Sequence, residues 1–142
     1  MSIRAALDDL QSKIGTETHL SDWLTITQER VNQFAEATGD FQWIHIDEDR
    51  AQASPFGSTI AHGFLTLSLI PHLAGSGDPD SPPRYEGAKM GINYGLNRVR
   101  FMNPVAVGSN LRMRTELLSA EAVKGNGIQV VNKVTLEIEG IE

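Results

Sequence analysis

The sequence predicts an α+β fold in which a curved antiparallel sheet wraps around one central helix. Residues 63–73 are apolar on nearly every side, so a helix there belongs inside the fold, with Pro71 bending it or marking its last turn. The second half of the chain alternates apolar and polar residues, which is typical of strands with one buried face. Because no repeat or linker divides the 142 residues, we expect a single domain over 1–142.

Helix signals fill much of the first half of the chain. Residues 3–14 place apolar side chains at helical spacing, and residues 18–26 predict a strand. Thr27 is expected to cap a helix that runs to Thr38, because a threonine hydroxyl accepts from amides of the first turn. Gly39 then stands where a left-handed residue ends many helices.

Two further features concern helix ends. Thr25 with Gln28 forms an alternative capping box for the start of the same helix. Asp47 is expected to cap a short helix over residues 48–53, which Pro55 stops because proline cannot continue it.

Strands are expected to dominate the second half. The pair Asn126-Gly127 is a strong hairpin signal between two alternating runs. Residues 75–87, rich in glycine and proline, predict a mobile surface loop. The expected strands cover residues 89–101, with a bulge near 97, 111–117 and 128–139.

The composition argues against several classes of function. The formal net charge is −6 and no Lys/Arg run is present, which disfavours a general nucleic-acid or membrane-surface binder. The absence of cysteine excludes disulfides, thiolate metal sites and a cysteine nucleophile. Nothing at the N-terminus resembles a signal peptide and no apolar run is long enough to span a bilayer, so we expect a cytoplasmic protein.

A carboxylate and an imidazole lie five positions apart, at Asp40 and His45, in a segment expected to be irregular. Hydrophobic neighbours such as Phe41 and Trp43 would form a wall around them. An acid–base pair of this kind can hold one water between its members and exchange protons with it. The spacing alone is not specific, and the ordinary alternative is that Asp40 caps a turn while His45 packs in a loop.

Gly63 opens the apolar helix, where the first amides lack partners within the helix and the helix dipole adds positive charge. A developing oxyanion can bind at such a place, although an ordinary helix start has the same sequence signal. His62 is expected to fix the helix start by hydrogen bonding, and His19 and His72 to be structural or exposed. No His/Asp/Glu cluster has metal-ligand spacing, so we expect neither a metal nor another cofactor.

Two linked blocks carry a family resemblance. They read Phe34-Ala35-x-x-Thr38-Gly39-Asp40-x4-His45-x-Asp47 and Phe56-Gly57-x-x-Ile60-Ala61-His62-Gly63-x-Leu65. In this order they resemble the signature of MaoC-like dehydratases, which include the (R)-specific enoyl-CoA hydratases. A third block resembles the branch related to nodulation protein N: Tyr94-Gly95-Leu96-Asn97-Arg98-Val99-Arg100-Phe101 with Pro104-Val105-x-Val107-Gly108.

The resemblance implies a hot-dog fold, with an antiparallel sheet around a long central helix, and a homodimer with active sites near the subunit interface. In such enzymes the motif Asp and His, here Asp40 and His45, activate a water. The glycine at the helix start, here Gly63, donates its amide to the thioester carbonyl. The implied reaction is reversible hydration of trans-2-enoyl thioesters to (R)-3-hydroxyacyl thioesters, a lyase activity of fatty acid metabolism. The thioester is one of CoA or of an acyl-carrier protein.

Two alternatives share this fold: a hot-dog thioesterase and a non-catalytic protein that binds acyl thioesters. Asp40, His45 and Gly63 together argue against the second, because binding alone has no need of a proton-transfer pair. The substrate's phosphates have four candidate contacts, namely Arg84, Lys89, Arg98 and Arg100.

This sequence departs from the family pattern at two points. Gln42-Trp43 stands where many relatives have Asn-Pro, so the wall beside the motif His is expected to differ. The chain stops at Glu142, where relatives turn and return in one further strand. We therefore expect either a shortened form or a sheet that lacks this C-terminal edge strand.

Overall fold

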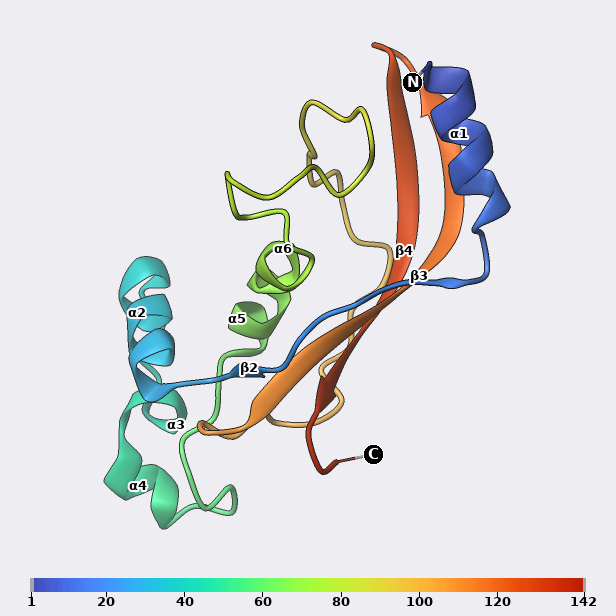
Figure 1. Cartoon of the computed structure of the whole chain (residues 1–142). Helices are drawn as coiled ribbons and strands as arrows, with labels where there is room; N and C mark the ends of the chain where they lie inside the picture. Colours follow the sequence, from blue (N-terminus) through green and yellow to red (C-terminus); the bar gives the residue numbers. More distant parts are fainter. Residues whose placement is uncertain (1, 142) are drawn as a thin grey trace. The chain divides into compact units, whose positions relative to one another are not determined.

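The computed structural model describes residues 2–141 (Figure 1), and these residues divide into two units by their contacts. The first unit comprises residues 2–22, Pro71–Asn93 and Met113–Glu137, and the second comprises Trp23–Ile70, Tyr94–Arg112 and residues 138–141. Helix α6 (Ile70–Leu73) and strand β3 (Asn110–Val123) each contain a point where the chain passes from one unit to the other.

The first unit is built on a pair of long strands, β3 and β4 (Gly127–Ile138). Strand β1 (Glu17–Leu20) pairs antiparallel with β3, so that Leu20 lies opposite Arg114. Helix α1 (Ile3–Ser12) runs alongside β3 and β4 (Figure 1), where the Gln11 side chain donates to the Ala120 carbonyl at 3.1 Å. The helix and the alternating strands predicted in this part of the chain are therefore confirmed.

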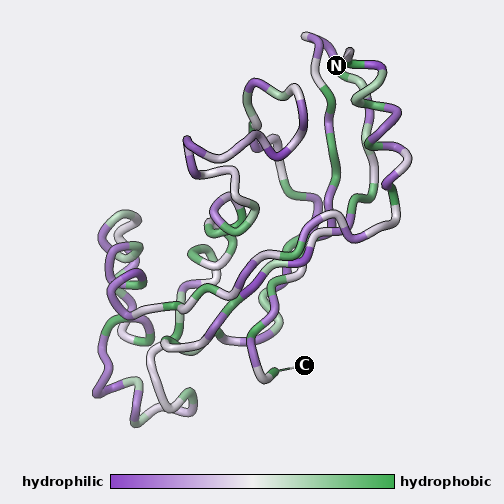
Figure 2. Tube along the Cα trace, in the orientation of Figure 1, coloured by the Kyte–Doolittle hydropathy of each residue, from purple (hydrophilic) through white to green (hydrophobic). Residues whose placement is uncertain are grey.

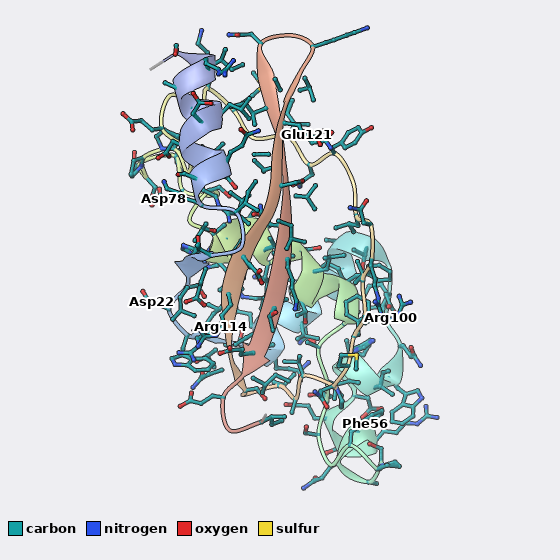
Figure 3. All side chains as sticks on the ribbon, turned by 90° about the vertical axis from the view of Figure 1, so that its right-hand side faces the viewer. Asp22, Phe56, Asp78, Arg100, Arg114 and Glu121 are labelled. Carbon is teal, nitrogen blue, oxygen red and sulfur yellow. The ribbon has the colours of Figure 1, made fainter. Side chains whose placement is uncertain are left out.

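The two faces of β3 differ in character within this unit. Met113, Thr115 and Leu117 are buried on one face, as the alternation predicts. Arg114, labelled in Figure 3, projects from the other face and forms ion pairs with Glu137 and, at 2.6 Å, with Glu17. Its hydrogen bond to Glu137, followed by the one to Glu17, raises the pKa of the guanidinium, which therefore stays charged.

The hairpin turn lies one residue earlier than predicted. Residues 124–126 form the turn, with the backbone of Gly125 and Asn126 left-handed, and Gly127 already begins β4. A left-handed pair at both central positions matches the right-handed twist of the flanking strands.

The second unit carries the helices α2 (Gln28–Thr38), α3 (Trp43–Ile46), α4 (Glu48–Gln52) and α5 (Gly63–Ser68). Here β2 (Leu24–Thr25) pairs antiparallel with the start of β3, so the single strand predicted over residues 18–26 is divided into β1 and β2. Thr27 caps α2 through its hydroxyl, which accepts from the Arg30 amide at 3.1 Å. The alternative start at Thr25 is therefore wrong.

Residues 59–61 form an extended segment that leads into α5. The Ala61 amide donates to the Val105 carbonyl at 2.8 Å, and the Val107 amide donates to Thr59 at 3.0 Å. Ile60 and Ala106 make an antiparallel bridge between the same two stretches. This pairing fixes the backbone immediately before Gly63.

The long central helix predicted over residues 63–73 is not present as one element. The stretch is mostly apolar, with green segments interrupted by pale and purple ones where Figure 1 marks α5 and α6 (Figure 2), but Leu69 divides it into α5 and the short α6. Pro71 explains the interruption, because it has no N–H to donate to the carbonyl of Leu67 one turn earlier. Phe64 is 68% exposed, so burial on every side is not observed either.

The strand predicted over residues 89–101, with its bulge, is wrong. These residues are irregular, and within residues 2–141 they pair with no strand. Apolar side chains of this stretch stand in solvent, with Ile92 79% and Tyr94 88% exposed. Alternation predicts a chain with two different faces, but a strand forms only where a second backbone supplies hydrogen bonds.

Within the described residues, no helix combines the length and the apolar character needed to cross a bilayer. Residues 75–87 contain neither helix nor strand, in agreement with the predicted loop.

Thr115 allows the energetic cost of a buried hydroxyl without a hydrogen-bond partner to be tested. Its side chain is fully buried, and among residues 2–141 its hydroxyl has no hydrogen-bond partner. Thr115→Val replaces the hydroxyl by a methyl group of similar volume and removes this uncompensated burial. We expect the free energy of unfolding to rise by about 1 kcal/mol, measured by urea denaturation.

Thr59→Val is the matched control, because the buried Thr59 hydroxyl donates to Gln28 at 2.5 Å. The same change there leaves the Gln28 acceptor unpaired and should lower stability by about 1–3 kcal/mol. Equal effects of the two substitutions would contradict this account.

Candidate functional site

The end of helix α2 places Asp40. Gly39 closes the helix in a left-handed conformation, with φ of 79°, a value that a side chain would make unfavourable. Asp40 follows on an irregular segment and is exposed, and its carboxylate accepts from the Gln42 amide at 3.3 Å. The carboxylate is thus accessible and held by a single weak local contact.

His45 lies on the single helical turn α3, whereas the sequence predicted an irregular segment. Its side chain is only 6% exposed. Nδ1 lies 2.7 Å from the Ile60 carbonyl, which can only accept, so Nδ1 carries the proton and donates. In the neutral ring Nε2 is then left with a free lone pair that can accept a proton or hold a water.

His62 lies directly against both of these residues. Its Nε2 donates to the Asp40 backbone carbonyl at 3.0 Å. Its ring stacks on that of His45, with centroids 3.8 Å apart and planes 24° apart, while Phe34 contacts it at 4.9 Å between centroids. The predicted role at the helix start is confirmed for the backbone, because the His62 carbonyl accepts from the Leu65 amide at 3.0 Å and the Thr66 amide at 3.2 Å, while its side chain makes no capping hydrogen bond.

Gly63 is the first residue of α5, as predicted. A Cβ at this position would lie 2.9 Å from Cδ2 of Phe101, closer than carbon atoms can pack. Glycine therefore allows the Phe101 ring to lie across the start of the helix. The Gly63 amide has no acceptor within the helix, since no turn precedes it.

Asp40, His45 and His62 each offer one atom that could bind a metal ion, and these three atoms lie within 4.8 Å of one another. The sequence has no metal-ligand spacing, yet the fold brings these three side chains together, because it places His62 beside two residues that are far from it in sequence. A metal ion needs lone pairs that converge on one point, whereas the two imidazoles are stacked nearly parallel. The arrangement fits hydrogen bonding and ring packing better than chelation.

Gln28 holds the elements of the site together and was missed as a functional residue. Its amide nitrogen donates to the His45 carbonyl at 2.8 Å and to Asn32 at 2.9 Å, and its oxygen accepts from Thr59. A signal was available in the sequence. Gln28 precedes Val31 and Ala35 at helical spacing, so a polar residue occupies the buried face of α2.

The proposed phosphate contacts do not form a defined cluster. Arg100, labelled in Figure 3, donates to the neighbouring Val99 carbonyl at 2.7 Å. Arg84 lies 5.4 Å from the centre of the adjacent Tyr85 ring. Their role toward a ligand, like that of Lys89 and Arg98, stays a prediction.

Comparison with known proteins gives a consistent result. Residues 9–139 match the family model of the MaoC like domain. The chain is 49% identical over 132 residues to 3-hydroxyacyl-thioester dehydratase Z of Mycobacterium tuberculosis, covering 93% of this chain and 84% of that protein. It is 45% identical over 135 residues to nodulation protein N of Rhizobium leguminosarum, covering 94% and 81%.

The fold also has solved counterparts. A structure from Archaeoglobus, described as a monoamine oxidase regulatory protein, aligns with a TM-score of 0.75 and 25% identity. The alignment covers 91% of this chain and 82% of that one. These similarities place the chain among α+β proteins of the hot-dog type.

The network around Gln28 can be tested by substitution. Gln28→Met keeps the length of the side chain but leaves the His45 carbonyl and the Thr59 hydroxyl without their partner. We expect the free energy of unfolding to fall by about 1–3 kcal/mol, measured by urea denaturation. Asn32→Ala is the control, because Asn32 is exposed and shares only the same amide; it should change stability by less than about 0.5 kcal/mol.

Proposed function

The chain belongs to the MaoC-like domain family, and from that premise we propose that it is a 3-hydroxyacyl-thioester dehydratase. In the reverse direction it hydrates trans-2-enoyl thioesters to (R)-3-hydroxyacyl thioesters. The observation that carries the proposal is the meeting of the Asp40 carboxylate and the His45 imidazole beside the start of α5. The name of the mycobacterial relative supports the same class of substrate.

The two side chains divide the proton transfers between them. In hydration, Asp40 accepts a proton from a bound water while the oxygen of that water forms a bond to C3 of the enoyl group. His45 orients this water through Nε2 and takes part in returning a proton to C2. The C2–C3 double bond is consumed, and no redox change occurs. The exposure of Asp40 suits this role, since water must reach it.

The Gly63 amide is proposed to stabilise the negative charge that develops during the reaction. Negative charge develops on the thioester oxygen when water adds at C3. The amide at the first residue of α5 has no acceptor within the helix and is available to donate to that oxygen, while the Phe101 ring takes the space that a Cβ would fill. Removal of one such donor typically lowers the rate by roughly 10²–10³-fold.

The wider assignment follows from the same family membership. The chain is proposed to form a single hot-dog domain, and the protein to work in the cytoplasm without a metal or other cofactor. The acyl carrier is CoA or an acyl-carrier protein, with Arg84, Lys89, Arg98 and Arg100 as candidate phosphate contacts.

A second copy of this chain is the proposed partner. Residues 94–102 of the second unit expose a row of large apolar side chains, namely Tyr94, Leu96, Phe101 and Met102. Several exposed large apolar side chains in one short segment are unusual on a monomer and typical of a subunit interface. A homodimer would bury it in the manner that the family resemblance implies.

The acid–base pair gives the decisive test. Asp40→Asn removes one proton-transfer group while keeping the shape of the side chain, and His45→Gln removes the other while keeping a polar side chain. We expect each to lower crotonyl-CoA hydration by roughly 10²–10⁴-fold. Turnover is followed by loss of enoyl absorbance, together with an assay for free thiol. Hydration consumes the enoyl signal without releasing thiol, whereas a thioesterase releases it.

The matched controls are Asp22→Asn and His72→Gln, which change an exposed carboxylate and an exposed imidazole elsewhere. Both should keep wild-type turnover. Near-wild-type activity of either site variant would refute the dyad, and binding of enoyl thioesters without turnover would favour the non-catalytic alternative.

The interface is tested by placing a charge in the exposed apolar row. Leu96→Glu should shift the protein from dimer to monomer, measured by light scattering at micromolar concentration, because an unpaired charge cannot be buried cheaply. Leu118→Glu is the control, since Leu118 is an exposed leucine of β3 outside this row. A wild-type protein that is monomeric at these concentrations would contradict the proposed dimer.

A further inference from the structure

The ring of His62 joins the two halves of the acid–base pair, and we propose that His62 is a positioning residue for both. This inference rests on the proposed function, since it concerns the same reaction. His62 is not assigned a proton transfer. It holds the backbone of Asp40 through a hydrogen bond and the plane of the His45 ring through stacking.

The hydrogen bond compensates for the weak anchoring of Asp40. Asp40 is exposed on an irregular segment, and its carboxylate makes one local contact at 3.3 Å. The donation from His62 Nε2 to the Asp40 carbonyl, at 3.0 Å, ties this segment to a residue that is only 2% exposed. The carboxylate is thereby held from the backbone while its oxygens stay free for water.

The stacking on His62 fixes the tilt of the His45 ring, which the single hydrogen bond at Nδ1 leaves free. Nδ1 of His45 is held by the Ile60 carbonyl, and a contact at one ring atom still allows the ring to tilt about it. The face of His62 lies 3.8 Å away at the centroids and restricts that tilt. Phe34 contacts His62 in turn, so the position of the ring pair is set by packing.

The burial of an unpaired ring nitrogen favours a functional reason for histidine at position 62. Nδ1 of His62 is buried and has no hydrogen-bond partner among residues 2–141, which costs about 1–3 kcal/mol relative to a satisfied group. A phenylalanine would fill a similar space without that penalty. Purely structural packing would therefore be served at least as well by an apolar ring, and the presence of an imidazole points to the hydrogen bond with Asp40.

Two substitutions separate the two contacts. His62→Phe keeps a ring against His45 but removes the donor to Asp40, and His62→Gln keeps an N–H donor but removes the ring. We expect each to lower kcat for crotonyl-CoA hydration by about 10- to 100-fold, because small misplacement of reacting groups has effects of this size. KM should change by less than about threefold, since neither substitution removes a contact that binds the substrate equally in the ground state and the transition state. The urea midpoint of His62→Phe should equal or exceed that of the wild type.

A double substitution distinguishes positioning from a general loss of folded protein. In the Asp40→Asn background, His62→Phe should lower the residual rate no further, because the group that it positions is already gone. The control is His19→Phe, which removes a similar histidine-to-carbonyl hydrogen bond, to Leu73 at 2.8 Å, outside the site. It should leave kcat unchanged.

The outcomes are separable. An active wild type whose kcat survives His62→Phe overturns the positioning role and leaves the proposed function standing. Additive losses in the double variant, or a loss that follows only a lowered urea midpoint, also overturn it. A wild type that hydrates no enoyl thioester overturns the proposed function and this inference together.

Discussion

The second unit depends on one short extended segment, residues 59–62, which forms hydrogen bonds with several neighbouring elements. The Ile60 amide donates to Ile44 at 3.0 Å, and its carbonyl accepts from the His45 ring. The Ala61 amide donates to Val105, and the His62 ring donates to Asp40. Because buried backbone groups without partners are costly, these bonds constrain the segment to one arrangement.

That constraint explains how the candidate site is assembled from distant parts of the sequence. Helix α3 brings His45 to the segment, the end of α2 brings Asp40, and Gly63 begins α5 immediately after it. Gln28 adds a link between the His45 carbonyl and Thr59. The chemistry therefore depends on backbone positions that helices and a bridge define, and not on a flexible loop alone.

What the sequence predicted well is local in origin. The cap at Thr27 and the left-handed Gly39 bound α2 as expected, because both signals act through groups a few residues apart. The approach of Asp40 and His45 was also foreseeable, since both follow one helix end. The stacking of His62 on His45 was not, because its cause is the bridge between residues 59–61 and 105–107, which lie far apart in the chain.

The failures have a common physical form. Residues 89–101 alternate as a strand should, yet a strand needs a partner backbone, which a periodic pattern does not identify. Residues 63–73 are apolar enough for one buried helix, but the missing N–H of Pro71 decides the hydrogen bonding locally. In both cases the side-chain pattern predicted a regular element, and the available backbone hydrogen bonds did not support it.

The site sets a buried, fixed histidine against an exposed carboxylate, and this asymmetry suits reversible hydration. A group that exchanges protons with water must be reached by water, which favours the exposed position of Asp40. A group that orients the same water must keep a fixed position, which favours the buried ring of His45. An exposed carboxylate would be mobile without further contacts, so a rigid part of the protein has to hold Asp40 in place. The His62 ring, buried against His45 and bonded to the Asp40 backbone, meets that requirement without occupying the carboxylate oxygens.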